Sequence, residues 1–188
     1  MATSLHINLN ALDESFIEEL RQRYGAAEVE ILLTETPQDG LTEDGFWQLI
    51  ECLDWENEGD DDAVIEPLVQ ALANLPNANI HQFEDILAEK LWLLDTGEHA
   101  EASIRDQEKD YVSVDGFLYD RCCVVANGKE LYEEVLHDPS KFPTGLSFER
   151  LLSVASLAYE RKTGKAFVHI PRKSYETYSN EAGWEDAD

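Results

Sequence analysis

Apolar residues recur with a helical period from residue 42 onward, and this pattern constrains the fold of the chain more than any other feature. The first stripe consists of Phe46, Trp47, Ile50 and Leu53. Thr42 precedes it, followed by two acidic residues, as is typical of a helix N-terminus. Further stripes lie within residues 65–72, 80–94, 114–126, 130–138 and 148–163. The pattern predicts a helical domain over residues 42–188.

Local signals predict where several of these helices begin and end. Asn79 with Gln82 three residues later resembles a capping box. Gly128 and Gly164 each stand where a helix would end in a glycine C-cap. Residues 96–111 are polar and show no clear period, so we expect a connection without regular structure there.

A different pattern, the alternation of apolar and polar residues, occurs near the N-terminus. The pattern of residues 4–35 predicts a strand, a helix and a second strand, and residues 165–170 near the other end of the chain are a further candidate strand. The expected fold class is therefore α+β, mostly α, with a small strand–helix–strand module in residues 1–36 before the helical domain. Two strands alone are marginal in water and leave unpaired edges. We therefore expect a homodimer that forms through residues 4–35.

The charge of the chain limits its partners. The chain contains forty acidic and fourteen basic residues, which gives a net charge of −26. Residues 41–66 alone contain ten acidic residues and no basic one. Such a surface repels phosphate backbones and anionic lipid and attracts basic proteins. We expect no nucleic acid as a partner and, without a run of about 20 apolar residues, no membrane span. The expected binding residues are Asp54, Glu56, Glu58, Asp60, Asp61 and Asp62.

The same acidic stretch imitates a calcium loop only in part. Asp54, Glu56, Glu58 and Gly59 occupy positions 1, 3, 5 and 6, but position 12, which needs a bidentate carboxylate, is Ile65. The histidines and cysteines show no zinc-site spacing either. We therefore expect no metal and no cofactor, and no motif identifies a catalytic residue.

Three segments resemble the bacterial family called domain of unknown function 4240. They are Phe46-Trp47, LPNANIHQFEDIL at 75–87, and FLYDRCCVVANGKELYEEVLHDP at 117–139. The positions that match the later family motif are Asp115, Gly116, Phe117, Arg121, Gly128, Tyr132 and Asp138-Pro139. The resemblance covers about residues 42–165. It implies a helical fold and carries no reaction with it.

Arg121 is the single residue with two competing interpretations. It falls in the middle of a helix that is predicted to be buried, so its guanidinium needs a carboxylate or several carbonyl groups. In one interpretation Glu149 or Asp115 forms a structural ion pair with it. In the other, Arg121, Tyr119, Glu149 and Asp115 line a pocket that binds an anion.

Two functional hypotheses follow. The first is a non-enzymatic acidic binding protein that docks a basic protein, such as an immunity protein, an antitoxin-like inhibitor or a nucleic-acid mimic. The alternative is an enzyme of unknown reaction with an anion pocket around Arg121. Three cysteines do not make a disulfide framework, and with no signal-peptide pattern at the N-terminus they indicate a cytoplasmic protein.

Overall fold

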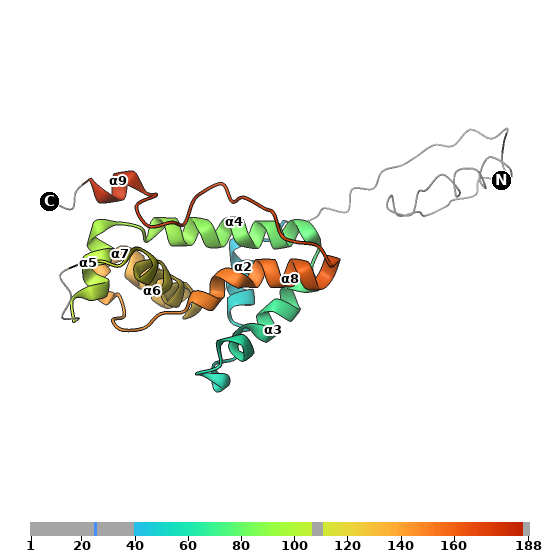
Figure 1. Ribbon diagram of the computed structural model, residues 1–188, viewed down its shortest axis with the longest axis horizontal. Helices are drawn as coiled ribbons and strands as arrows, with labels where there is room; N and C mark the ends of the chain where they lie inside the picture. The colour runs from blue at the N-terminus through green and yellow to red at the C-terminus, as the bar shows by residue number, and fades with distance from the viewer. Residues whose placement is uncertain (1–24, 26–39, 107–110, 186–188) are drawn as a thin grey trace. The chain divides into compact units, whose positions relative to one another are not determined.

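The computed structural model describes Gly25, residues 40–106 and residues 111–185. The chain divides into two units, Met1–Gln38 and Asp39–Asp188, and the described helices all belong to the second unit (Figure 1). In chain order the α-helices are α2 (Glu43–Ile50), α3 (Asp61–Ala73), α4 (Asn77–Leu93), α5 (Gly97–Ile104), α6 (Val114–Ala126), α7 (Lys129–His137), α8 (Val154–Thr163) and α9 (Glu181–Trp184). Short 3-10 helices lie at η2 (Trp55–Asn57), η3 (Pro139–Lys141) and η4 (Glu149–Ser153).

Side-chain caps begin four of the described α-helices. The hydroxyl of Thr42 accepts a hydrogen bond from the amide of Gly45, as predicted. Asp60, Thr96 and Ser113 cap α3, α5 and α6 in the same way. Each cap satisfies an amide that the first turn of a helix leaves without an internal partner. At the other end of α8, Gly164 has a φ of 67°, a conformation that strains residues with a Cβ.

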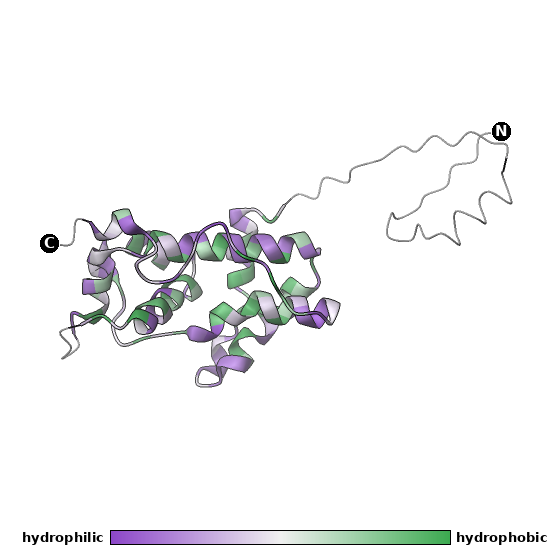
Figure 2. Cartoon of the chain, turned by 45° about the horizontal axis from the view of Figure 1, so that its top comes forward, coloured by the Kyte–Doolittle hydropathy of each residue, from purple (hydrophilic) through white to green (hydrophobic). Residues whose placement is uncertain are grey.

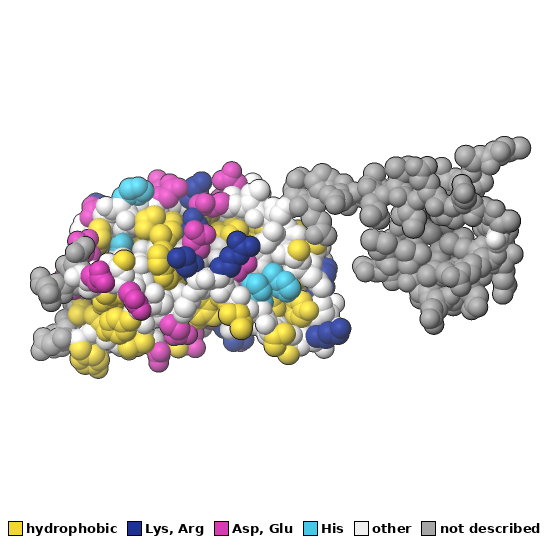
Figure 3. Space-filling model, turned by 90° about the horizontal axis from the view of Figure 1, so that it is seen from above, with side chains coloured by type: hydrophobic (Ala, Val, Ile, Leu, Met, Phe, Trp, Pro, Cys, Tyr) yellow, Lys and Arg dark blue, Asp and Glu magenta, His cyan; other side chains and the backbone are white. Residues whose placement is uncertain are grey.

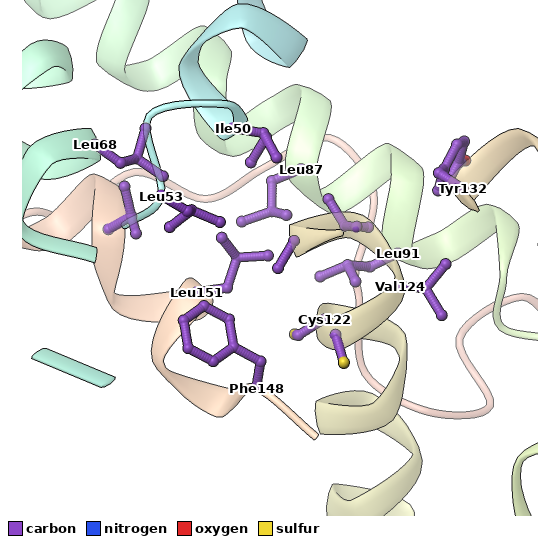
Figure 4. Packing of buried hydrophobic residues seen from close by; sticks show 14 of the residues in the cluster. Ile50, Leu53, Leu68, Leu87, Leu91, Cys122, Val124, Tyr132, Phe148 and Leu151 are labelled. Atoms are coloured by element: carbon purple, nitrogen blue, oxygen red, sulfur yellow. The ribbon is translucent and has the colours of Figure 1, made fainter. Parts of the chain in front are cut away.

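The helices enclose one hydrophobic core. α3 packs against α8, while α4 packs against both α6 and α8. Hydrophobic residues concentrate where the helices face one another (Figure 2). Leu68 of α3, Leu87 and Leu91 of α4, Cys122 of α6 and Leu151 of η4 meet in this core with less than 1% of their surface exposed (Figure 4). The predicted helical stripes therefore face a common interior.

The predicted α+β class is wrong for the described part of the chain, which contains helices and no strand. The predicted strand–helix–strand module of residues 4–35 is not seen and, Gly25 apart, lies outside the described residues. The strand predicted at residues 165–170 is also absent. An alternation does exist over residues 167–170, because Phe167 and His169 are partly buried and Val168 and Ile170 are exposed. It does not produce a strand because the segment lies against helices, which offer no backbone edge for pairing.

Two helix predictions also need correction. Residues 96–111 were expected to be irregular, yet α5 occupies Gly97–Ile104. Its buried residues include glycine, histidine and serine, so a search for an apolar stripe misses it. The capping box at Asn79 is wrong as well, since α4 begins at Asn77 and the Gln82 side chain accepts a hydrogen bond from the amide of Leu41 instead.

Candidate functional site: an acidic turn and a buried arginine

The acidic residues expected to bind a partner lie on the connection between α2 and α3 and on the first turn of α3, which contains Asp61 and Asp62. Asp54 has a local structural role, because its carboxylate accepts hydrogen bonds from the Glu56 amide at 3.2 Å and the Asn57 side chain at 2.9 Å. Asp60 caps α3 through the amide of Ala63. The turn is therefore held in shape by the carboxylates that also give it its charge.

Basic residues from other helices neutralise part of this acidic stretch. Four ion pairs reach it from elsewhere: Lys90–Glu43, Lys129–Asp44, Arg150–Asp62 and Arg161–Glu66. Within the described residues, the other six carboxylates of residues 41–66 form no ion pair: Glu51, Asp54, Glu56, Glu58, Asp60 and Asp61. We call residues 51–61 the acidic turn. Within residues 41–66, the carboxylates without an ion pair therefore lie next to one another in the acidic turn, and Asp62, an expected binding residue, is already paired.

Trp55 lies in the middle of the acidic turn. Its side chain is 42% exposed, and its ring centroid is 5.1 Å from that of Phe148. One side of the indole is thus supported by the protein while the other faces solvent. Sequence reasoning did not select Trp55, although a tryptophan among acidic residues was visible in the sequence. Tryptophan is enriched among the residues that carry most of the binding energy at protein interfaces.

Arg121 is completely buried in α6. Its guanidinium donates to the Leu91 carbonyl at 2.7 Å, the Thr177 hydroxyl at 2.9 Å and the Tyr175 carbonyl at 3.1 Å. Its carboxylate partner is Asp95, at 3.9 Å, and not Glu149 or Asp115. Burial lowers the pKa of Arg121, and the charge of Asp95 opposes that shift.

Asp95 explains why this arginine is buried. It is itself fully buried and accepts hydrogen bonds from the amides of Tyr178 and Asn180 and from the indole of Trp184. The Arg121–Asp95 pair therefore holds the C-terminal segment against α4 and α6. A buried charge that is paired and hydrogen-bonded in this way is a structural element, with no exposed surface to offer an anion.

The other three residues of the predicted anion pocket lie together without Arg121. Tyr119 hydrogen-bonds Glu149, and desolvation followed by the charges of Glu149 and Asp115 raises the pKa of Tyr119. A cavity of about 290 Å³ borders Tyr119 and Asp120, and none of its described lining residues is Lys or Arg. These surroundings are acidic, which is the wrong charge for an anion site.

A second polar cluster, which sequence reasoning missed, lies where the C-terminal segment crosses α4. His169 stacks on His81 with ring centroids 4.8 Å apart, and its Nε2 lies 3.0 Å from the Asp85 carboxylate. Burial raises the pKa of Glu84 to about 7, and burial together with Glu84 raises that of Tyr175 to about 12. The two halves of this cluster are more than 80 residues apart in sequence, so no local motif could reveal it.

The remaining candidate roles are metal binding, thiol reactivity and membrane insertion. Over residues 40–106 and 111–185, no three His, Cys, Asp or Glu side chains group as metal ligands would. Burial raises the pKa of the Cys123 thiol to about 11 and also raises that of Cys122, which disfavours a nucleophilic thiolate at either. No helix in the described ranges has the length and apolar character required to cross a bilayer.

A comparison with known protein families gave a match within the helical unit. Residues 41–161 match the model of the family described as "Protein of unknown function (DUF4240)". The chain belongs to this family. The resemblance noted in the sequence is thereby confirmed, and the matched region of this DUF4240 protein includes both the acidic turn and Arg121. Comparisons with curated proteins and with solved structures gave no match.

Proposed function

We propose that this DUF4240 protein is a non-enzymatic binding protein whose acidic turn docks a basic protein. The observation that carries the proposal is the distribution of charge left after folding. Six carboxylates without ion pairs among the described residues surround the half-exposed Trp55, while the acids on either side of them are neutralised by other helices. An immunity protein, an antitoxin-like inhibitor and a nucleic-acid mimic all fit this surface.

The two parts of the surface have different expected roles. The carboxylates attract a basic partner from a distance and raise its association rate, an effect that salt screens. Trp55 supplies contact area that is buried only in the complex, and so governs how slowly the partner leaves. A cytoplasmic location fits this proposal, since Cys52, Cys122 and Cys123 are all free thiols.

The test begins with affinity capture by the full-length chain from its source cells, followed by measurement of binding rates for the captured partner. Neutralising the turn with Glu56→Gln, Glu58→Gln and Asp61→Asn together should slow association by about tenfold or more at low salt. These three carboxylates are exposed and neither cap a helix nor form an ion pair within the described residues. Trp55→Ala should instead raise the dissociation rate, with a loss of about 2 kcal/mol or more in binding.

A matched control separates the local surface from total charge. Glu101→Gln, Glu130→Gln and Glu134→Gln remove three exposed charges from α5 and α7 and change the net charge by the same amount. Association of this control should stay much closer to that of the wild type. Equal slowing in both triple variants, an acidic partner, or association that does not respond to salt would each refute the proposal.

A further inference from the structure

The segment that follows α8 has two faces of opposite character. Its inner face is anchored, because Phe167 lies 5.4 Å from the ring of Tyr159 and His169 stacks on His81. Its outer face carries Val168 and Ile170, each 87% exposed, which makes them the most exposed large hydrophobic residues in the described part of the chain. The segment is thus held with two β-branched side chains pointing to solvent.

The backbone of this segment is also unpartnered. Among the described residues, no backbone–backbone hydrogen bond involves Ala166 to Ile170. The alternation of partly buried and exposed side chains has the period of an extended chain, whose amide and carbonyl groups point sideways. An extended chain with free edge groups and exposed β-branched side chains is a template for strand addition.

The charge around the segment indicates the chemistry of what would cover it. Residues 161–173 hold five basic residues and no acid, in a chain whose net charge is −26. Arg161 and Lys162 are already bound to Glu66 and the Ala73 carbonyl. The side chains of Lys165 and Arg172 form no ion pair within the described residues. The exposed apolar pair is therefore bordered by cations at both ends.

Figure 3 looks onto the face on which the C-terminal segment crosses α4, and basic, histidine and hydrophobic side chains lie close together there. We call residues 165–172 the basic edge. The whole of this edge lies beyond the region that matches the DUF4240 family, which ends at residue 161.

We propose that the basic edge is a second docking site, which takes an extended segment of a partner protein with acidic ends and apolar side chains at alternate positions. The partner segment would pair its backbone with that of residues 166–170. Its apolar side chains would cover Val168 and Ile170, and its acidic ends would meet Lys165 and Arg172. This site is separate from the acidic turn. It would bind an acidic segment, whereas the acidic turn would bind a basic protein.

A synthetic peptide tests the site directly. The probe is acetyl-Asp-Glu-Val-Thr-Val-Thr-Ile-Glu-Asp-amide, labelled for fluorescence anisotropy, and the control peptide has the same composition with its three apolar residues adjacent. The salt should be about 0.15 M, where the Debye length is about 8 Å and the net negative charge of the protein repels the probe little. Hydrogen exchange of the full-length chain should show the amides of residues 166–170 becoming protected when the probe binds, and not with the control peptide.

Paired variants assign the binding. Val168→Thr with Ile170→Thr keeps the β-branched shape but removes apolar surface, and should weaken probe binding by about tenfold or more. Val114→Thr with Leu146→Thr makes a comparable change at exposed positions elsewhere and should alter binding by no more than about twofold.

Three outcomes would overturn the proposal. The first is no binding of the probe at about 1 mM, and the second is equal binding of the probe by the Val168/Ile170 variant. The third is self-association of the unmodified chain that the same variant abolishes in light scattering, since a second copy would then be the occupant.

Discussion

Removal of the Asp95 carboxylate should destabilise the fold, because Arg121 has a structural role in α6 as the partner of Asp95 and does not bind a ligand. The Asp95→Ala variant leaves the guanidinium fully buried with its nearest carboxylate gone. It also removes the acceptor for the Tyr178 and Asn180 amides and the Trp184 indole. Breaking one side of a buried pair costs about 3–5 kcal/mol, a large part of the roughly 5–15 kcal/mol that stabilises a typical domain.

A double-mutant cycle then isolates the pair. Arg121→Met replaces the charge with a flexible apolar side chain, so the combined variant no longer contains an isolated buried charge. Its loss of stability should be smaller than the sum of the two single losses by about 1–3 kcal/mol. The assay is urea unfolding followed by circular dichroism, with hydrogen exchange at Asn180 as a local measure of whether the C-terminal segment stays attached.

An exposed pair provides the control for this cycle. Asp44 lies 3.4 Å from Lys129 and is largely exposed, so Asp44→Ala should cost less than about 1 kcal/mol. Additive losses at Asp95 and Arg121, to within about 0.5 kcal/mol, would refute the reasoning. So would a stable Asp95→Ala variant whose C-terminal segment remains protected.

Three further results are expected. Because burial raises the pKa of Glu84 from 4.5 to about 7, the folded state keeps this proton to higher pH than the unfolded state, and its contribution to stability falls as pH rises between those values. Urea titrations give the free energy of unfolding at about pH 4 and pH 8, and Glu84→Gln should reduce the difference between the two by roughly 3 kcal/mol. An unchanged difference would contradict the raised pKa of Glu84. A thiol reagent should modify Cys52 in the native protein and reach Cys122 and Cys123 only after denaturation, since these two are buried; rapid reaction of all three would count against this core. Gly183→Ala should loosen α9, because the added Cβ would lie 2.7 Å from a threonine methyl group, and an unchanged melting temperature would show that the contact relaxes freely.

Much of the helical domain was predictable because its signals are local. The Thr42 cap and the glycine C-cap at Gly164 each act within one turn, and the structure confirms both. The stripe of Phe46, Trp47 and Ile50 is buried as its helical period predicts. The α5 helix was missed because its buried face carries small and polar residues, which an apolar period does not detect.

The candidate sites depended much more on tertiary structure. The sequence by itself determined that residues 41–66 carry ten acids and no base, but only the fold decided which of them acquire a basic partner from another helix. In the same way, the sequence indicated that Arg121 would need a partner, whereas the choice of Asp95 required α4, α6 and the C-terminal segment to meet. Caps and stripes are encoded between residues within a few positions of each other. Charge pairing, and the exposure of Trp55, Val168 and Ile170, depend on side chains far apart in the chain that come together only when the helices pack.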